Sequence, residues 1–250
     1  MKVEIHPSAQ AAGAAAARAA ARHLTALGRI RDSIAVVFAT GASQFEMLNE
    51  LTGVAGLPWN KVSGFHMDEY VGLSANHPAS FRGYLRQRLT GKVRMKEFCE
   101  IDGSSPDPEL TGSEYADRLR SAEPQLCLLG IGENGHLAFN DPPVADFADP
   151  LDVKTVQLDE ACRQQQVAEG WFGSVEEVPR YAITLTIPAL FRVPKLIVSV
   201  PGKRKAEIVR RAFEEPVSTR CPATILRTHP DATVYLDLES ARELGGFKCA

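Results

Sequence analysis

Short apolar runs alternate along this chain with longer stretches that have the periodicity of helices, and this alternation restricts the fold more than any other feature. The apolar runs predict strands over residues 2–5, 33–39, 62–67, 125–131, 181–187, 195–200 and 232–236. The other stretches predict helices over 9–27, 44–51, 79–89, 112–121, 203–213 and 238–244. Strands that are separated by helices pair in parallel through right-handed crossovers. The sequence therefore predicts an α/β fold built on a parallel sheet.

The length of 250 residues is enough for one sizeable hydrophobic core. The sequence contains no internal repeat and no low-complexity linker, so we expect a single domain over residues 1–250. The stretch from about 146 to 179 is polar and has few apolar residues to anchor it. We expect this stretch to be a mobile lid or insertion.

Charge and composition exclude several classes of partner. The formal net charge is −3 and acidic and basic residues are interspersed, whereas a nucleic-acid-binding surface would need a basic stripe. No apolar run approaches the length of a membrane span, and the alanine-rich stretch 11–21 lacks the residue order of a signal peptide. The five cysteines form no CxxC pair, which is typical of free thiols in a reducing compartment. We therefore expect a cytoplasmic protein without nucleic-acid or membrane partners.

The most informative motif is LLGIGENGHLAFNDP at residues 128–142, where a predicted strand ends in glycines and polar residues. Ligands of open α/β sheets bind at the carboxyl ends of strands. His136 can carry a proton near neutral pH, Asn134 could orient it or bind a substrate hydroxyl, and Asp141 could fix its tautomer. The alternative is a loop histidine that a backbone carbonyl satisfies. Because no further ligand residues lie at short spacing, we expect no metal site.

Two other predicted strand ends favour an anionic ligand. The first is the loop Thr40, Gly41, Ala42 and Ser43, whose small residues allow backbone N–H groups to approach an anion; alternatively, Ser43 caps a helix. The second is the segment 201–205, where three cations begin a helix and a bound phosphate would offset their conflict with the helix dipole. Together these ends indicate a phosphorylated small molecule.

An acidic pair, Asp68 and Glu69, follows the predicted strand 62–67. Adjacent residues on an extended chain point in opposite directions, so only one of the two can face a site and act as a general base. The other would be structural, and a solvated turn is the alternative for both.

These motifs resemble those of the glucosamine-6-phosphate deaminase (isomerase) family, within the wider group that includes 6-phosphogluconolactonase. DEYVGL at 68–73, followed by HPASF at 77–81, is similar to the aspartate motif of the deaminases, and GIGENGHLAFN at 130–140 is similar to their histidine motif. Residues 202–206 resemble the segment that carries the family's phosphate-binding lysine, here Lys205. The resemblance spans almost the whole chain. It implies an open, mostly parallel, doubly wound sheet with helices on both faces, similar to a Rossmann fold.

The resemblance also implies chemistry without a cofactor on a phosphorylated amino sugar, most directly the conversion of glucosamine 6-phosphate to fructose 6-phosphate and ammonia. His136 would assist opening of the pyranose ring, and Asp68 would move a proton from C2 to C1 through an enolamine. Asn134 and Asp141 would complete the catalytic group. The residues expected to bind the substrate or its phosphate are Thr40, Gly41, Ala42, Ser43, Lys205, Glu69, Gly135 and Arg163.

Several positions depart from the family's usual pattern. Many members have aspartate where this chain has Asn134, and glutamate is usual where it has Asp141. The Asp141 side chain is one methylene shorter, and its contact with His136 could be lost unless the backbone advances. Ala42 replaces a usual glycine. The lid arginine that the family uses for phosphate has no clean counterpart, and we expect Arg163 to take its place.

Alternatives to the glucosamine substrate stay open. The altered residues could contact sugar hydroxyls, which would suit galactosamine 6-phosphate or a related hexosamine phosphate. A 6-phosphogluconolactonase would normally carry arginine after the acidic pair, where this chain has Tyr70. A sugar-phosphate sensor without activity is the third alternative, and the presence of Asp68 and His136 argues against it. A homo-oligomer is possible, although no surface pattern indicates its size.

Overall fold

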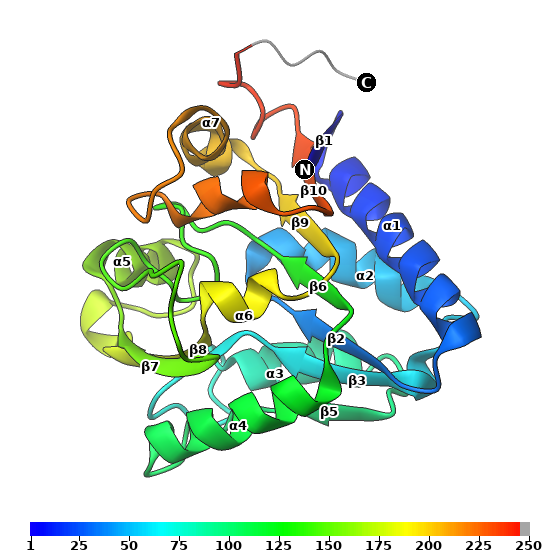
Figure 1. The fold of residues 1–250 in the computed structure, drawn as a ribbon. Helices are drawn as coiled ribbons and strands as arrows, with labels where there is room; N and C mark the ends of the chain where they lie inside the picture. Colours follow the sequence, from blue (N-terminus) through cyan, green and yellow to red (C-terminus); the bar gives the residue numbers. More distant parts are fainter. Residues whose placement is uncertain (246–250) are drawn as a thin grey trace.

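A computed structural model describes residues 1–245, so Cys249 lies outside the described residues. At its centre is an open seven-stranded sheet in the order β1-β10-β9-β6-β2-β3-β5, in which every neighbouring pair is parallel (Figure 1). The strands are β1 (Lys2–His6), β2 (Ile34–Phe38), β3 (Val62–His66), β5 (Glu97–Cys99), β6 (Leu126–Leu129), β9 (Leu196–Val200) and β10 (Ala232–Asp237). This confirms the predicted parallel, doubly wound sheet.

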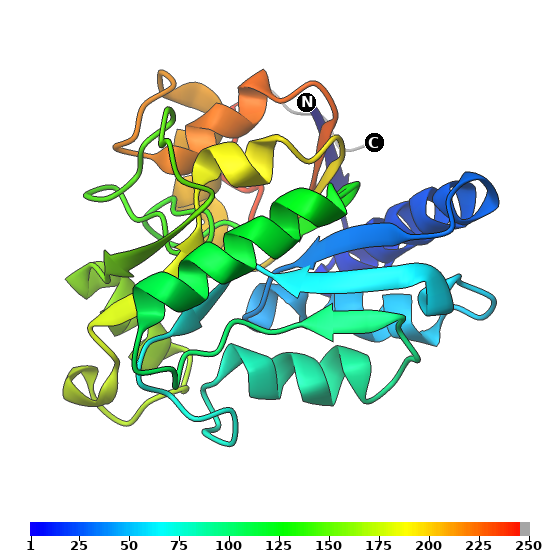
Figure 2. The same ribbon diagram turned by 60° about the horizontal axis from the view of Figure 1, so that its bottom comes forward.

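Helices cover both faces of this sheet because its strands are apolar on both faces. In β2, Ile34, Val36 and Phe38 pack against one layer, while Ala35 and Val37 pack against the other. The first layer consists of α1 (Ala9–Ile30), α2 (Phe45–Gly53) and α3 (Phe81–Leu85), and the second of α4 (Pro108–Ala122), α6 (Ile187–Phe191) and α7 (Ala206–Glu214). Figure 2 shows α4 and α3 on opposite sides of the sheet. The short helical segments are η1 (Ala42–Gln44), η2 (Trp59–Lys61), η3 (Arg86–Thr90), η4 (Val175–Glu177), η5 (Lys203–Lys205) and η6 (Pro222–Thr228).

A second, three-stranded antiparallel sheet lies beside the first, in the order β4-β8-β7. It comprises β4 (Asp68–Tyr70), β7 (Val153–Gln157) and β8 (Tyr181–Leu185). The strand predicted over 181–187 therefore exists, but it belongs to this smaller sheet. The two sheets are joined where the Leu185 N–H donates to the Met67 carbonyl at 2.7 Å. The sequence did not predict β4, β5 or β7, which are short or polar, nor α5 (Glu160–Ala168).

The helix predicted over 238–244 is wrong, because these residues form turns. Asp237 ends β10, and its carboxylate accepts the backbone N–H of Ser240 at 2.8 Å and that of Gly202 at 3.0 Å. An aspartate that binds nearby backbone donors competes with helix formation.

The stretch 146–179 is better anchored than its polar composition predicted. Phe172 and Val178 are buried in an apolar cluster that also holds Tyr70 of β4, and the Phe172 and Tyr70 rings lie 5.5 Å apart. Val156 of β7 joins the same cluster. The expectation of few apolar anchors is therefore wrong, while movement of the stretch as a lid stays a prediction.

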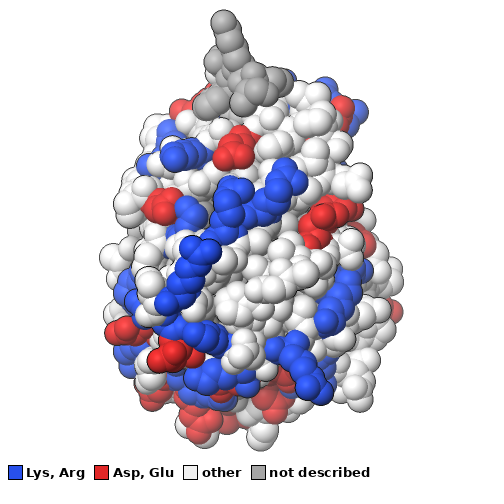
Figure 3. Space-filling view, turned by 90° about the vertical axis from the view of Figure 1, so that its right-hand side faces the viewer, with Lys and Arg blue, Asp and Glu red and all other residues white. Residues whose placement is uncertain are grey.

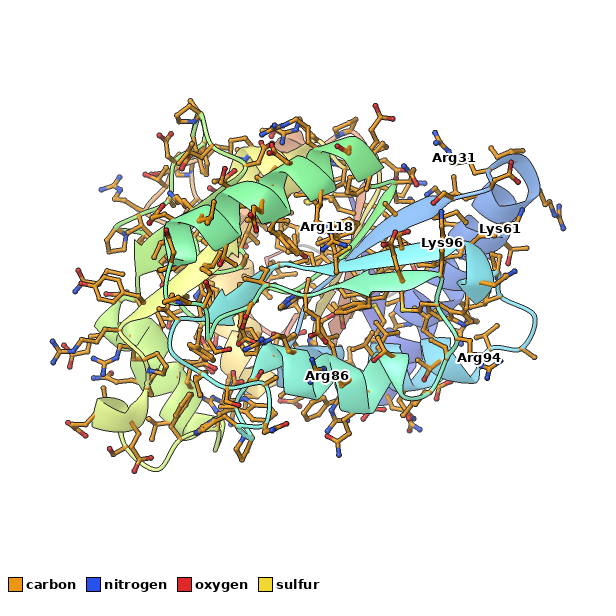
Figure 4. All side chains as sticks on the ribbon, turned by 90° about the horizontal axis from the view of Figure 1, so that it is seen from below. Arg31, Lys61, Arg86, Arg94, Lys96 and Arg118 are labelled. Atoms are coloured by element: carbon orange, nitrogen blue, oxygen red, sulfur yellow. The ribbon has the colours of Figure 1, made fainter. Side chains whose placement is uncertain are left out.

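Basic side chains lie near one another on the faces shown in Figures 3 and 4. On the face shown in Figure 3, Lys and Arg form a diagonal row with acidic side chains on either side. At the amino ends of β2, β3 and β5, Arg31, Lys61 and Lys96 lie close to one another (Figure 4). Lys61 donates to the carbonyls of Gly28 and Arg31, so its role there is to close the end of α1. No helix among residues 1–245 is both long enough and apolar enough to cross a bilayer.

Candidate active site

A pocket of about 370 Å³ opens at the carboxyl ends of the parallel strands. The chain first adds β3 and β5 on one side of β2 and then β6, β9 and β10 on the other, so the strand order reverses between β2 and β6. Such a reversal leaves a crevice at the strand ends in open α/β sheets. The loops after β2, β6 and β9 all line this pocket.

The loops after β2 and β9 have the same local geometry and flank the β6 loop. In each, a glycine at positive φ leads into the helical turn, Gly41 at 90° and Gly202 at 97°. A single 3₁₀ turn follows, η1 or η5, and then a helix. The positive φ requires glycine at both positions, since other residues are strained there. This shape turns the start of each helix toward the pocket, as an anion site needs.

All four residues of the first predicted anion loop, Thr40, Gly41, Ala42 and Ser43, line the pocket. Ser43 does not cap α2, so the capping alternative is wrong. Its hydroxyl accepts a hydrogen bond from the buried Gln44 amide at 3.1 Å, and its carbonyl accepts one from the Ser199 hydroxyl. The loop is thereby tied to the end of β9.

The second anion loop brings Lys205 to the pocket wall with 8% of its surface exposed. Burial lowers the pKa of Lys205, while the nearby carboxylates of Glu169 and Glu133 oppose that shift. Arg204 also lines the pocket and forms an ion pair with Glu133, with Nε 2.8 Å from Oε1. Lys205 therefore has no ion-pair partner within 4 Å among the described residues.

Asp68 and Glu69 separate as β-strand geometry requires. Asp68 faces the pocket with 7% exposure, and burial, reinforced by the charges of Glu69 and Asp141, raises its pKa well above the usual value. Glu69 is fully buried on the other side of β4. Its carboxylate accepts hydrogen bonds from Ser80 Oγ, the Arg82 side chain and three backbone N–H groups. The expectation that Glu69 binds substrate is therefore wrong.

His136 lies at the pocket with its Nδ1 2.8 Å from Oδ1 of Asp141. The shorter aspartate therefore reaches the histidine, and the contact is kept. Burial raises the pKa of Asp141, but the His136 charge and hydrogen bonds from His136 and Asn134 outweigh burial and hold it below the usual value. Asp141 is therefore ionised and fixes the ring.

Two residues of the histidine loop act from behind the ring. The Asn134 amide donates to Asp141 Oδ1 at 2.8 Å, and its oxygen accepts the His136 N–H at 3.1 Å. Gly135 does not line the pocket, so its predicted contact with substrate is wrong; its carbonyl accepts the N–H of Ala223 at 2.8 Å. Asn134 thus contacts the backbone of His136 and the carboxylate that holds its ring, while its expected roles stay predictions.

The helix α5, in the stretch predicted to be a lid, faces the pocket through residues that the sequence analysis did not choose. Arg163 points away, and its guanidinium donates to the carbonyls of Val175 and Val178, so its predicted phosphate contact is wrong. Gln165, Gln166 and Glu169 line the pocket instead. They recur with Cys162 at spacings of three and four residues, which is one face of a helix. That spacing was the signal that could have found them.

Cys162 changes the argument about metals. Its Sγ and ligand atoms of His136 and Asp141 all lie within 4.8 Å of one another. The expectation of no metal site rested on short spacing along the chain, whereas α5 brings a third donor from 26 residues beyond His136. Spacing was therefore insufficient evidence.

Known proteins resemble the chain over nearly its whole length. The family model of glucosamine-6-phosphate isomerases and 6-phosphogluconolactonase matches residues 7–235. A glucosamine-6-phosphate deaminase of Exiguobacterium sp. is 38% identical over 183 residues, covering 72% of this chain and 69% of the relative. That of Arthrobacter sp. is 33% identical over 250 residues, covering 98% and 93%.

Solved structures show the same likeness. A monomeric glucosamine-6-phosphate deaminase matches with a TM-score of 0.89 at 28% identity, covering 97% of this chain and 100% of its own. A 6-phosphogluconolactonase from Thermotoga maritima matches with a TM-score of 0.76 at 20% identity, covering 94% and 98%. At 20% identity, the match to the 6-phosphogluconolactonase shows a shared fold.

Proposed function

The chain belongs to the family of glucosamine-6-phosphate isomerases and 6-phosphogluconolactonases, and we propose that it is an enzyme that converts glucosamine 6-phosphate to fructose 6-phosphate and ammonia. One observation carries the proposal. A single pocket brings together a buried carboxylate, Asp68, a carboxylate-bound histidine, His136, and a lysine without an ion-pair partner, Lys205, between two glycine-led loops.

Ring opening is the first step that these residues explain. The anomeric hydroxyl must lose a proton and the ring oxygen must gain one, so the catalyst has to accept and donate protons near neutral pH. His136 suits this role because its Nδ1 contacts Asp141, whereas its Nε2 lies beside Gly132 at the pocket and is free to exchange a proton. Asp141 would stabilise the imidazolium that forms when His136 holds the extra proton.

Proton transfer between carbons follows. In the open-chain sugar, Asp68 would take the proton from C2, forming an enolamine, and return it to C1. One carboxylate on one face of the planar intermediate reaches both carbons, so no second base is needed. The product is an imine at C2. Water adds to this C=N bond, and ammonia leaves, which is the hydrolytic part of the reaction.

Phosphate binding would position these reacting atoms. The loop 40–43 and Lys205 lie on either side of the histidine loop, at the ends of β2 and β9. A phosphate held there uses binding energy remote from C1 and C2 to orient them. Neither Asp68 nor His136 then needs to bind the sugar tightly.

The test is release of ammonia and fructose 6-phosphate from glucosamine 6-phosphate by the purified protein without added cofactor. We expect both products in equal amounts. Asp68→Asn should lower kcat by about 10²–10⁴-fold, because the amide cannot accept the C2 proton. Binding of fructose 6-phosphate, measured by calorimetry, should change little in this variant. Unchanged turnover in Asp68→Asn would reject the proton-transfer role.

The neighbouring carboxylate provides a matched control. Glu69→Gln removes a charge one residue away on the opposite side of β4, where Arg82 is its partner. We expect the free energy of unfolding to fall by about 1–3 kcal/mol because hydrogen bonds to a buried carboxylate weaken. The reaction itself should continue in the folded variant.

The same assay separates the alternative substrates. Galactosamine 6-phosphate differs only at C4 and would give a ketose phosphate and ammonia, whereas 6-phosphogluconolactone would give acid and no ammonia. Tyr70 occupies the position after the acidic pair and donates to Gln166 Oε1 at 2.8 Å, so it holds the lid helix instead of facing a lactone. Turnover of the lactone alone would overturn the proposed deamination.

A further inference from the structure

The proposed proton carrier, His136, belongs to a cluster of three potential metal ligands. Cys162 of α5, His136 and Asp141 place Sγ, a ring nitrogen and a carboxylate oxygen within 4.8 Å of one another. Thiolate, imidazole and carboxylate are the ligands that Zn²⁺ binds in proteins, at about 2.0–2.3 Å. Donor atoms around such an ion lie within about 4 Å of each other. Small side-chain movements would therefore close the cluster around an ion.

Asp141 connects the three side chains of this cluster. Its side chain is fully buried, and its Oδ1 accepts a hydrogen bond from Asn134 and contacts His136. The carboxylate is also hydrogen-bonded to the Cys162 thiol and to the backbone N–H of Asp159. A cation that replaces the thiol proton would keep this buried carboxylate paired. Cys162, 1% exposed, lies beside this carboxylate.

We propose that Cys162, His136 and Asp141 form a site for a thiophilic divalent cation, with Zn²⁺ as its model, and that a cation bound there stops His136 from carrying protons. Binding forms bonds from the metal to Sγ, to Nδ1 and to Asp141. The thiol proton leaves to solvent, the neutral imidazole moves its single proton from Nδ1 to Nε2, and no atom is oxidised or reduced. Nδ1 is then bonded to the metal and Nε2 carries the proton, so the ring cannot accept another. The inhibitory half of this inference rests on the proposed function, whereas the binding half does not.

Entry of the ion requires movement of α5. His136 lines the pocket, but Cys162 and Asp141 lie behind it and are almost completely buried. Arg163, the next residue along the helix, ties α5 to the carbonyls of Val175 and Val178. Metal binding should therefore be slower than diffusion, and ligands that hold α5 against the pocket should slow it further.

The first experiment uses Co²⁺ as a spectroscopic probe on the full chain. Co²⁺ bound to a thiolate gives a charge-transfer absorption, which does not depend on enzyme activity. We expect one equivalent to produce this band in the wild type, and the band to be lost in Cys162→Ala and in His136→Ala. Cys99→Ala is the matched control, because Cys99 is also a buried cysteine but lies on β5; Cys249→Ser removes the thiol outside the described residues. Both controls should keep the band.

The second experiment measures Zn²⁺ inhibition of ammonia release. One equivalent of Zn²⁺ should lower turnover of the wild type more than tenfold, and a chelator should restore it. Cys162→Ala, which lies outside the proposed catalytic and binding groups, should keep its basal turnover and resist Zn²⁺. Cys162→Ser preserves the size of the side chain and serves the same purpose where the alanine variant is unstable.

The two readouts fail in distinguishable ways. A wild type without a stoichiometric Co²⁺ band, or a band that persists in Cys162→Ala and Cys162→Ser, would overturn the site. A band that depends on Cys162 in a protein without deaminase activity would support the site and reject the proposed function. Zn²⁺ that binds through Cys162 without lowering turnover would overturn the inhibitory role.

Discussion

Gly132 shows how one missing side chain controls the proposed catalyst. A Cβ built at this position would lie 2.1 Å from Nε2 of His136 and 2.2–2.4 Å from its ring carbons. The ring can therefore lie against the backbone only because residue 132 is glycine. The φ of Gly132 is not in the left-handed region, so this requirement comes from space alone.

Gly132→Ala is accordingly expected to displace the His136 ring without changing the phosphate loops. A displacement of about 1 Å at a reacting group costs about 10²-fold in rate, so we expect kcat for ammonia release to fall by that order. Fructose 6-phosphate binding, measured by calorimetry, should be retained. Gly53→Ala is the control, since a Cβ there meets nothing within 4 Å. Equal kcat in the two variants would contradict the steric argument.

The buried charges of Asp68 and Lys205 predict the pH dependence of kcat/KM. Asp68 must be ionised to act as a base, and burial together with Glu69 and Asp141 raises its pKa. Activity should therefore fall with acidification well above the pH near 4 where exposed aspartates titrate. Burial lowers the pKa of Lys205, although Glu169 and Glu133 oppose that shift. As the pH rises, Lys205 should therefore lose its charge, and phosphate binding should weaken, at a lower pH than the value near 10 that is typical of lysine. Lys205→Arg should move only the alkaline limb upward; an unmoved alkaline limb would exclude Lys205 from phosphate binding.

Among the described residues, the helix α5 and its C-cap place one carboxylate, that of Glu169, and no basic side chain at the pocket wall. Glu169 lines the pocket and accepts hydrogen bonds from Gln165 at 2.7 Å and from Trp171 at 3.2 Å. A carboxylate near Lys205 opposes the approach of a phosphate, unlike the arginine expected in this lid. The two lid amides, Gln165 and Gln166, offer neutral donors and acceptors instead.

We expect Glu169→Gln to lower KM for glucosamine 6-phosphate by about three- to tenfold, which corresponds to about 0.7–1.4 kcal/mol of relieved repulsion. Glu160→Gln is the matched control, because Glu160 lies on the same helix but is exposed and does not line the pocket. Steady-state kinetics of the two variants at constant ionic strength would measure the difference. A raised KM in Glu169→Gln would mean that Glu169 binds the sugar directly.

The success of sequence analysis depended on how local each element's signal was. The apolar strands of the main sheet and the glycine-led loops have local patterns, so they were predicted, together with the pocket residues Asp68, His136 and Lys205. Glu69 and Arg163 were misassigned because their orientation depends on the pleat of β4 and on the face of α5, and neither element was predicted. Cys162 meets His136 only through tertiary folding. Sequence spacing alone could not show that contact.

For the whole molecule, the pocket depends on how the two sheets join. Asp68 comes from the small sheet, whereas His136 and both glycine-led loops come from the large one. Besides the bond from Leu185 N–H to the Met67 carbonyl, the joint includes hydrogen bonds from Phe139 N–H to Thr184 Oγ1 at 3.0 Å and from the Asn140 amide to the Leu185 carbonyl at 2.8 Å. These bonds hold the two sheets together and therefore set the distance between the proposed base, Asp68, and the proposed proton carrier, His136.

The same architecture divides the proposed lid, residues 146–179, into a fixed and a movable part. β7 is paired along its whole length with β8, whereas α5 is held by side chains such as Arg163 and Gln165. Amide hydrogen exchange, followed by mass spectrometry, should therefore be slower for the β7 amides that bond to β8 than for α5, because α5 is joined to its surroundings through side chains and can open as a unit. Saturating fructose 6-phosphate should slow exchange in α5 and leave β7 unchanged. Arg163→Ala should speed exchange in α5, since it frees the carbonyls of Val175 and Val178. If α5 exchanges as slowly as β2 in the free protein and does not respond to the ligand, the segment is a fixed wall of the pocket and the lid proposal fails.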